Sequence, residues 1–387
     1  MDTKLINQIL ARGVTNIIPS KNSLTEMLLS GKKLNVYLGI DPTATQIHIG
    51  HAVPLRKLSA LSKLGHNVTF LIGDFTALIG DTSDKTSERP ILSQEQVQEN
   101  FKTYKAQAEK VCDFSNIKIR YNSEWLSKLN FVDIIKLAQN FSVGDFIGRE
   151  LIKKRLQEGK RVRLDETLYP VMQGYDSYFL NTDIQIGGAD QTFNMQAGRI
   201  LQKNLRGKES YILVTNYLLG TNGAKMSKSL GNAIWLNDPP DEMYGKIMSI
   251  TDSNILAYFE MATNLPDEEI RNYKERLEKG ENPMKIKKSL AHQIVSELHS
   301  EKEADLAQQN FENIFQRNNA EFRIKIKNQE NLLKTLAQID NLSNSEIKRL
   351  LSKNAIEING KVENNPFVKL SAGDKVRIGK RKFVQIV

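Results

Sequence analysis

The sequence predicts an α/β protein with a parallel sheet, a helical insertion in that sheet, a following α-helical domain and a small α+β tail domain. Three observations support this prediction. Short β-branched runs alternate with helical stretches from about residue 34 to 230, which is typical of βαβ units. The pattern is helical from about 238 to 325, and a helix followed by short strands occupies 331–387. We therefore expect domains at 1–230, 231–325 and 331–387.

The composition is that of a globular chain with two or three domains. The 387 residues are 40% hydrophobic and 26% charged, which excludes a disordered, collagenous or coiled-coil chain. A single cysteine, Cys112, excludes a disulfide framework and a zinc site built on paired cysteines. No apolar run approaches the ~18 residues that span a bilayer, and the first residues have no signal-peptide core. These features favour a reducing compartment, the cytoplasm.

The predicted sheet is built from five short runs, and helical stretches separate them. We expect its strands at 34–40, 68–73, 117–121, 183–187 and 210–215. A helical pattern at 50–64 ends at Gly65, a residue that suits a helix C-terminus. Residues 122–182 are mostly helical and interrupt the alternation, so we expect them to form an insertion between two halves of the sheet.

The remainder of the chain changes pattern twice. Ile286, Leu290, Ile294 and Leu298 recur at four-residue spacing, which predicts one buried helix face. The polar segment 317–330 is expected to be a connector. The last 57 residues carry 11 Lys and Arg against 5 Asp and Glu, a local net charge of +6 out of +9 for the chain. A polyanionic partner is therefore most plausible at the tail.

Two of the chain's five histidines, His48 and His51, open the helix that follows the first predicted strand. A spacing of three residues puts both side chains on one helix face. Gly50 between them lets a ligand approach the backbone, and a helix N-terminus favours phosphate because its free N–H groups and dipole attract anions. The alternatives are a chance pair and a metal-binding pair, which lacks a recognisable third ligand.

A basic loop, Lys225-Met226-Ser227-Lys228-Ser229, follows a glycine-containing stretch after the last predicted strand. Two lysines and two hydroxyl groups on a flexible loop can wrap a polyphosphate and then release it. Taken alone, such a run is also typical of a solvated basic loop.

The two motifs together resemble the class I aminoacyl-tRNA synthetases, in which they clamp the triphosphate of ATP. Residues 37–51 and three further segments resemble the tyrosyl-tRNA synthetases: LIGDTSDKTSER (78–89), YPVMQGYD (169–176) and IGGADQTFNMQAGR (186–199). The resemblance covers essentially the whole chain and is strongest from 34 to 230. It implies a Rossmann-like nucleotide-binding catalytic domain with a dimer interface at 122–182, and an anticodon-binding-type helical domain at 231–325.

Tyr169, Gln173 and Asp176 are spaced four and three residues apart, so they form a polar stripe on a predicted helix. A solvent-facing stripe is one interpretation. With Tyr37 on the first strand, a pocket for a polar aromatic substrate is the other. The resemblance implies that Tyr37 and Asp176 hydrogen-bond the phenol of tyrosine. The residues that it places around the rest of the amino acid are Asp81, Tyr169, Gln173 and Gln191.

The resemblance also implies a nucleotide site. An acidic residue after a Gly-Gly turn, such as Asp190, suits ribose hydroxyl groups, and it can also cap the following helix. The residues implied to contact ATP or the aminoacyl-adenylate are Gly39, Asp41, Gly50, Gly187, Asp190, Gln191 and Lys228. Those implied to stabilise the transition state are Thr43, His48, His51, Lys225, Lys228 and Ser229.

Basic side chains outside the sheet are candidates for RNA contacts. The tail resembles a small RNA-binding domain named after a ribosomal small-subunit protein, through segments at 345–349, 358–360 and 373–382. Ordinary solvated charges are the alternative, both there and in the polar loop at 82–89. The residues implied to contact tRNA or pyrophosphate are Lys85, Arg89, Lys348, Arg349, Lys380, Arg381 and Lys382.

The resemblance implies activation of tyrosine by ATP and transfer of the tyrosyl group to tRNA(Tyr), carried out by a homodimer. Magnesium is expected to arrive with ATP, without a metal held by the protein. Three alternatives stay open: a tryptophan-specific enzyme, a catalytically silent synthetase-like RNA-binding regulator, and a small-molecule adenylyltransferase with a similar helix start. The Tyr37 and Asp176 pair argues against the first, the intact motifs against the second, and the basic loop and tail against the third.

Overall fold

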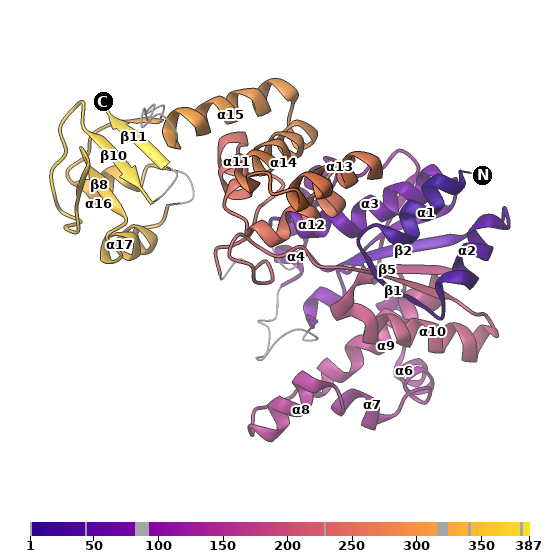
Figure 1. The fold of residues 1–387 in the computed structure, drawn as a ribbon. Coiled ribbons are helices and arrows are strands. Elements are labelled where there is room, and N and C mark those ends of the chain that lie inside the picture. The colour runs from indigo at the N-terminus through magenta and orange to yellow at the C-terminus, as the bar shows by residue number, and fades with distance from the viewer. Residues whose placement is uncertain are drawn as a thin grey trace. The chain divides into compact units, whose positions relative to one another are not determined.

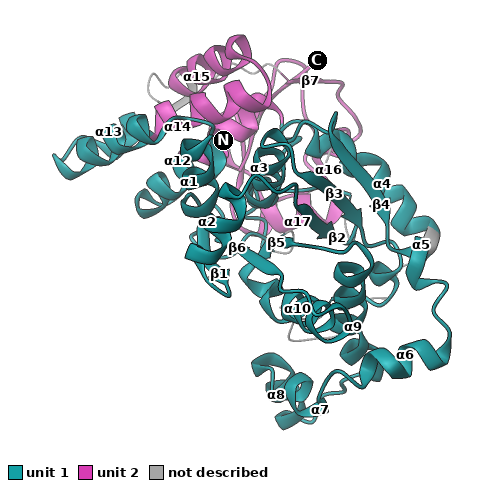
Figure 2. Ribbon diagram, turned by 90° about the vertical axis from the view of Figure 1, so that its right-hand side faces the viewer, with its two compact units in different colours: residues 1–238, 250–286 teal, residues 239–249, 287–387 magenta. Residues whose placement is uncertain are grey.

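The computed structural model describes residues 2–42, 45–81, 93–227, 230–315, 324–339, 342–379 and 382–387 (Figure 1). The chain divides into two compact units (Figure 2). The first comprises residues 1–238 and 250–286, and the second comprises 239–249 and 287–387. Each unit is described by itself below.

Six strands form the sheet of the first unit, as far as the described residues go. They are β1 (Val14–Ile18), β2 (Asn35–Ile40), β3 (Asn67–Ile72), β4 (Ile117–Tyr121), β5 (Ile184–Gly188) and β6 (Tyr211–Thr215). The order across the sheet is β1-β6-β5-β2-β3-β4, and β2 to β6 are parallel. These five confirm the predicted strands to within a residue or two.

Strand β1 was not predicted, and it pairs antiparallel with β6 at one edge of the sheet. Its five residues are mostly half-buried or exposed, and only Ile17 is buried. An edge strand of this kind lacks both the continuous apolar run of a central strand and a clean two-residue alternation. The sheet is therefore mixed rather than purely parallel.

Helices cover both faces of the sheet, with α3 on one face and α10 on the other (Figure 1). The helix predicted at 50–64 is α3, and Gly65 follows it with a positive φ of 85°. The helices of this unit outside the insertion are α1 (Thr3–Ala11), α2 (Lys21–Leu29), α3 (Ile49–Lys63), α4 (Gln94–Ala108), α10 (Thr192–Arg206), α12 (Ile255–Ala262) and α13 (Asp267–Glu278).

The segment between β4 and β5 is helical, as predicted for 122–182. It comprises α5 (Ser123–Leu126), α6 (Phe131–Ala138), α7 (Val143–Ile147), α8 (Glu150–Gln157) and α9 (Leu164–Phe179). A buried ion pair joins Arg155 of α8 to Glu166 of α9, with Nη1 and Oε2 2.6 Å apart. Helix α9 packs along α10, which brings the polar stripe on α9 next to the sheet.

The strand order places a crevice beside β2. The chain passes from β2 to β3 on one side and returns later to β5 on the other, so the connections diverge from β2 in opposite directions. In open α/β sheets, ligands bind at such a switch point, outside the carboxyl ends of the strands. Asp41 directly follows β2, and Gly187 and Gly188 end β5, so these residues lie where a ligand is expected.

The second unit combines helices with a five-stranded tail sheet, counted over the residues described. Its helices include α11 (Pro240–Met248), most of α14 (Pro283–Leu298), α15 (Glu301–Phe315), α16 (Leu332–Leu336) and α17 (Asn344–Ser352). Ile286, Leu290, Ile294 and Leu298 are all buried, which confirms the predicted face of α14. Asn310 of α15 donates a hydrogen bond of 2.8 Å to Asp241 of α11.

The tail sheet has the order β7-β11-β10-β8-β9. Its strands are β7 (Ile324–Ile326), β8 (Ile356–Ile358), β9 (Lys361–Val362), β10 (Lys375–Ile378) and β11 (Lys382–Ile386). Strand β7 pairs parallel with β11, so part of the expected connector at 317–330 belongs to the tail sheet. Ile326, Ile347 and Val384 share one buried apolar cluster, which gives the tail a core of its own.

Among the described residues, no helix has the length and apolar character that crossing a membrane requires.

Candidate active site

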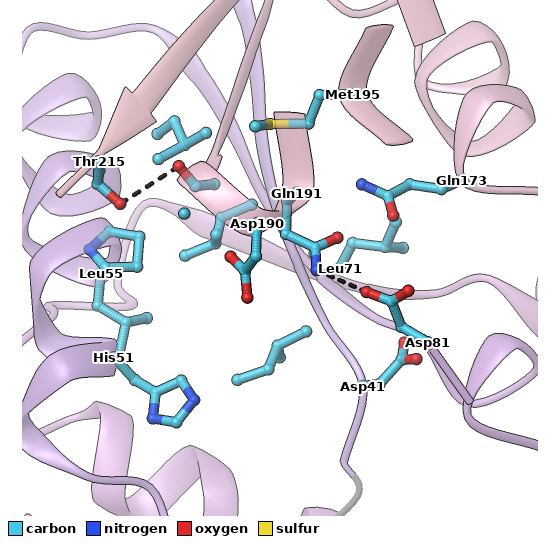
Figure 3. Close-up of a pocket in the computed structure, with 18 of the residues that line it drawn as sticks. Asp41, His51, Leu55, Leu71, Asp81, Gln173, Asp190, Gln191, Met195 and Thr215 are labelled. Carbon is cyan, nitrogen blue, oxygen red and sulfur yellow. Dashed lines mark hydrogen bonds between the residues drawn. The ribbon is translucent and has the colours of Figure 1, made fainter. Parts of the chain in front are cut away.

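A cavity of about 350 Å³ opens at the carboxyl ends of β2 and β5 (Figure 3). This volume is in the range of small-molecule sites. Fourteen of the site residues expected from the sequence line it: Tyr37, Gly39, Asp41, His48, Gly50, His51, Asp81, Tyr169, Gln173, Asp176, Gly187, Asp190, Gln191 and Lys225. Residues far apart in the sequence therefore share one cavity.

The other expected residues do not line this cavity or are not described. Thr43, Lys85, Arg89, Lys228, Ser229, Lys380 and Arg381 lie outside the described residues. Lys348 and Arg349 lie on α17 in the second unit, and Lys382 is the first residue of β11.

The inner end of the cavity holds Tyr37 and Asp176, both buried. The Tyr37 hydroxyl donates to Gln185 Oε1 at 3.1 Å. Asp176, only 3% exposed, accepts hydrogen bonds from Trp125 Nε1 at 2.7 Å and from Asn122 Nδ2 at 3.2 Å. Burial raises the pKa of Asp176 from its usual 3.8 to about 8, although these two hydrogen bonds oppose the rise. A buried carboxyl with two fixed donors is a strongly directional acceptor for a ligand hydroxyl group.

Hydrogen bonds connect this end of the cavity to Asp41. The hydroxyl of Tyr169 donates to Asp41 Oδ2 at 2.8 Å, and that of Thr76 donates to Asp41 Oδ1, also at 2.8 Å. Asn122 Nδ2 lies 3.0 Å from Thr76 Oγ1, so the amide that contacts Asp176 also holds the partner of Asp41. Gly73 makes room for this arrangement, because a Cβ there would lie 2.0 Å from Asp41 Oδ1.

Two side chains outside the expected set, Asn122 and Trp125, therefore hold the carboxyl group of Asp176. The sequence pattern contained one usable signal, because Asn122 directly follows the β4 strand and so lies at the carboxyl edge of the sheet. No local sequence pattern identified Trp125 as a site residue, because its contact with Asp176 depends on how α5 packs against α9.

The polar stripe on α9 faces the cavity rather than solvent. Tyr169 is 6% exposed and Asp176 is buried, so the solvent-facing interpretation is wrong for both. Gln173 also lines the cavity (Figure 3). Beside it, Gln191 Nε2 donates to Asp81 Oδ2 at 2.7 Å. The carboxyl groups of Asp41, Asp81 and Asp176 thus line one cavity, which suits a ligand carrying a cationic group.

The two histidines open α3 as expected. His48 precedes the first residue of α3, and its backbone N–H donates to His51 Nδ1 at 3.3 Å. The two ring centroids lie 3.9 Å apart. Gly50 is required here, since a Cβ would come within 2.9 Å of His48 Nδ1. Burial lowers the pKa of His48 to about 2 and that of His51 to about 4, so both rings are neutral near pH 7.

Lys225 brings the basic loop to the cavity as well. Its Nζ lies 3.1 Å from Asp190 Oδ2 and 4.9 Å from the ring centre of Tyr217. Burial, together with the charge of Asp190, raises the pKa of Tyr217 to about 12, so that this ring stays a neutral support for the ammonium group. Helix α10 begins at Thr192 with Gln191 before it, so Asp190 is not its N-cap and points into the cavity instead (Figure 3).

The arrangement offers two connected subsites. One is a buried, acid-rich space around Asp176 and Asp81, and the other is an anion-attracting edge formed by a helix N-terminus, His48 and Lys225. A small zwitterion in the first subsite would present its carboxylate to a phosphate bound at the second.

Known proteins resemble this chain over most of its length. Residues 29–316 match the family described as tRNA synthetases class I (W and Y). The tyrosine–tRNA ligase of Thermotoga maritima is 41% identical over 98% of this chain and 96% of its own. That of Carboxydothermus hydrogenoformans is 42% identical over 98% and 97%, respectively.

Solved structures have the same fold. The mitochondrial tyrosyl-tRNA synthetase of Aspergillus nidulans superposes with a TM-score of 0.67 at 23% identity, covering 80% of this chain and 94% of its own. The Archaeoglobus fulgidus tyrosyl-tRNA synthetase, solved with L-tyrosine, gives 0.63 at 23% identity, covering 80% and 100%. With the helix-opening histidines and the basic loop meeting at one cavity, the chain belongs to the class I aminoacyl-tRNA synthetases, in the family of the tryptophan and tyrosine enzymes.

Proposed function

We propose that the protein is a tyrosine–tRNA ligase. The observation that carries the proposal is the buried Asp176 carboxyl, held by Trp125 and Asn122 beside Tyr37 at the closed end of the cavity. Such a group complements the phenolic O–H of tyrosine. Phenylalanine would leave the remaining hydrogen-bonding capacity of Asp176 unmet, and an indole would have to enter a space bounded by both Tyr37 and Asp176.

The reaction has two steps. An oxygen of the tyrosine carboxylate attacks the α-phosphorus of ATP, the P–O bond to the β-phosphate breaks, and pyrophosphate leaves. A ribose hydroxyl group at the 3′-terminal adenosine of tRNA(Tyr) then attacks the carbonyl carbon of the adenylate, and AMP leaves. The first nucleophile is already ionised, so positioning and charge stabilisation account for catalysis of that step.

Different residues of the cavity would bind different groups of the substrates. Asp176 and Tyr37 would receive the phenol of tyrosine. Its ammonium group would lie among the acidic and amide side chains above them. The residues proposed for that group are Asp81, Tyr169, Gln173 and Gln191. Tyr169 donates to Asp41, which leaves the lone pairs of its own oxygen for the ammonium group.

The triphosphate would lie across the start of α3. His48 and His51 are neutral, so each ring can donate one N–H to phosphate oxygens without a permanent charge. Lys225 and, in the part of the loop outside the described residues, Lys228 and Ser229 would stabilise the charge that develops on the leaving pyrophosphate. Asp41, Asp190 and the Gly187 backbone would face the adenosine ribose, and magnesium would enter as the complex with ATP.

The tail and the helical insertion supply the remaining partners. Lys348 and Arg349 lie on α17 and would contact tRNA phosphates, together with the basic residues at 380–382. The insertion exposes large apolar side chains, including Phe131 (76%), Val143 (73%) and Leu164 (79%). We propose that they are buried between two copies of the chain, because soluble proteins seldom leave such a patch uncovered. Sedimentation of a monomer at micromolar concentration would refute the homodimer.

The division into catalytic, anticodon-binding-type and tail domains belongs to the same proposal, as does a place in the cytoplasm. Cys112 is a buried free thiol, which is compatible with a reducing compartment.

The test is tyrosine-dependent exchange of labelled pyrophosphate into ATP, with tryptophan and phenylalanine in parallel assays. We expect exchange with tyrosine, little with phenylalanine and none with tryptophan. Exchange with tryptophan instead would identify the enzyme as tryptophan-specific. Binding of tRNA without exchange for any of the three amino acids would indicate a silent RNA-binding regulator.

A further inference from the structure

The segment that follows the basic loop connects the two nucleotide-facing motifs. Ile234 accepts a hydrogen bond of 2.8 Å from the backbone N–H of Ile49, and the N–H of Leu236 donates 3.0 Å to the carbonyl of Ile47. These bonds bracket His48 on both sides. The backbone at 234–236 therefore holds the start of α3. Asn232 lies two residues before this segment in the sequence.

Asn232 joins this segment to the basic loop. It is 2% exposed, and its Oδ1 accepts from the Ser227 backbone N–H at 2.9 Å. Its Nδ2 donates to Asn222 Oδ1 at 2.7 Å. The same nitrogen lies 3.1 Å from the carbonyl oxygen of Lys225 and 3.3 Å from that of Ala224. One buried amide therefore contacts both arms of the loop that presents Lys225.

The backbone of Asn232 and the glycine opposite complete the arrangement. The Asn232 carbonyl accepts from the Thr221 N–H at 3.0 Å, and Gly220 N–H donates to the Ala224 carbonyl at 2.7 Å. A Cβ on Gly220 would lie 2.5 Å from Asn232 Nδ2 and 2.6 Å from its carbonyl oxygen. A side chain at residue 220 would therefore displace Asn232.

Only an amide side chain fits these contacts. Its oxygen must accept from a backbone N–H while its nitrogen donates to oxygens on the other side. Aspartate keeps the acceptor, but it would bring a carboxylate against three oxygen atoms. Leucine or alanine would remove the hydrogen bonds that Asn232 makes with the Ser227 N–H and the Lys225 carbonyl, and with them the link between the two arms of the loop.

We propose that Asn232 is a positioning residue for adenylate formation, which sets the place of Lys225 relative to the start of α3. Asn232 does not itself line the cavity. Asn232 affects the reaction indirectly. It holds the backbone carbonyl of Lys225, and the side chain of Lys225 lies beside Asp190. The inference rests on the proposed ligase function.

The role predicts a split between kinetic constants. Displacing a phosphate-binding lysine by about 1 Å is enough for about 100-fold loss of rate. In tyrosine-dependent pyrophosphate exchange, Asn232→Asp and Asn232→Ala should lower kcat between about 10-fold and 100-fold, with the KM for tyrosine changed less than about twofold. Gly220→Ala disturbs the same amide from the opposite side while Asn232 is kept, so it should have the same signature.

A double-mutant cycle separates positioning from a general loss of structure. If Asn232 acts through Lys225, Asn232→Ala should add little to Lys225→Ala, because the group being positioned is already gone. If Asn232 serves only general stability, the two losses should add. Asn331→Ala is the matched control, since Asn331 likewise bonds a backbone N–H, as the N-cap of α16 in the tail, and should leave exchange unchanged.

The outcomes distinguish the two levels of the proposal. No tyrosine-dependent exchange in the wild-type protein would overturn the ligase function. Wild-type exchange with Asn232→Asp and Gly220→Ala equally active would overturn the positioning role alone. Additive losses in the cycle, or a rise in tyrosine KM equal to the fall in kcat, would also overturn it. If Asn232→Ala does not fold, Asn232→Asp and Gly220→Ala provide the same tests.

Discussion

The indole N–H of Trp125 lies 2.7 Å from a carboxylate oxygen of Asp176, and both side chains are buried. Trp125 also stacks on Phe179, with the ring centres 4.5 Å apart. The tryptophan is thus held in place by α9, the same helix that carries Asp176. The direction in which Asp176 presents its free lone pairs therefore depends on an aromatic residue from α5.

Trp125→Phe should weaken tyrosine binding while leaving ATP use intact. The substitution keeps the stacking surface but removes the donor, and a hydrogen bond to a neutral group contributes about 0.5–1.5 kcal/mol. We expect the KM for tyrosine in pyrophosphate exchange to rise roughly 2-fold to 10-fold, with the KM for ATP unchanged. Tyr244→Phe, which removes a buried hydroxyl group in the second unit, is the control. A tyrosine KM equal to that of wild type would contradict the role of Trp125.

The stability of Asp176→Asn relative to the wild-type protein, both without ligand, should increase as the pH rises. Asp176 keeps its proton up to about pH 8 when folded, but it ionises near pH 4 when unfolded. The folded state therefore binds more protons in that interval, and its stability falls as the pH rises from about 4 to about 8. The amide does not titrate. The Tm difference between Asp176→Asn and wild type should grow from pH 5 to pH 9; a constant difference would refute the raised pKa.

Lys225→Ala should slow adenylate formation far more than it weakens tyrosine binding. The ammonium group lies beside Asp190, and Lys225 lines the cavity. Removing a group that acts on the transition state typically costs about 2.7–4 kcal/mol, or 100-fold to 1000-fold in kcat. Single-turnover formation of tyrosyl-adenylate measures this directly. Lys118→Ala on the exposed side of β4 is the control, and equal losses in kcat and tyrosine affinity would argue against a transition-state role.

Removal of the tail should separate the two reaction steps. The deletion should begin at residue 324 rather than 331, because Ile324–Ile326 pair with β11 and Ile326 belongs to the tail core. Without 324–387, tyrosine-dependent pyrophosphate exchange should persist, since the cavity is built from the first unit. Charging of tRNA(Tyr) should fall at least about 10-fold, with a weaker dependence on salt, because phosphate contacts are lost. A truncated protein that charges tRNA at the wild-type rate would show that the tail has no RNA role.

The sequence predicted the central strands well because they are continuous apolar runs between clear helix signals. The motifs at the start of α3 and in the basic loop were also recognisable, since each lies within a few consecutive residues. The side chains that the sequence pattern missed contact the site across long separations. Asn122 and Trp125 lie more than 50 residues from Asp176, and Asn232 looked like an ordinary loop residue.

Local patterns also fail where partners are distant strands. The residues of β7 were predicted to belong to a polar connector, because three residues with one buried side chain have too little periodicity to predict a strand. Their identity as a strand depends on β11, about 60 residues later. The shifted pKa values of the site could not be predicted from the sequence either. Asp176 and the two histidines become buried only when α3, α9 and the sheet have assembled.

The pairing of β1 with β6 has a consequence for synthesis on the ribosome. Val14 is synthesised some 200 residues before its partner Thr215. The nascent chain must keep β1 unpaired until most of the first unit has been made, which is the regime in which stray edge pairing occurs. Thr215 also donates to the Gly187 carbonyl at the cavity wall, so a loss of the β1 pairing would act on the wall through β6.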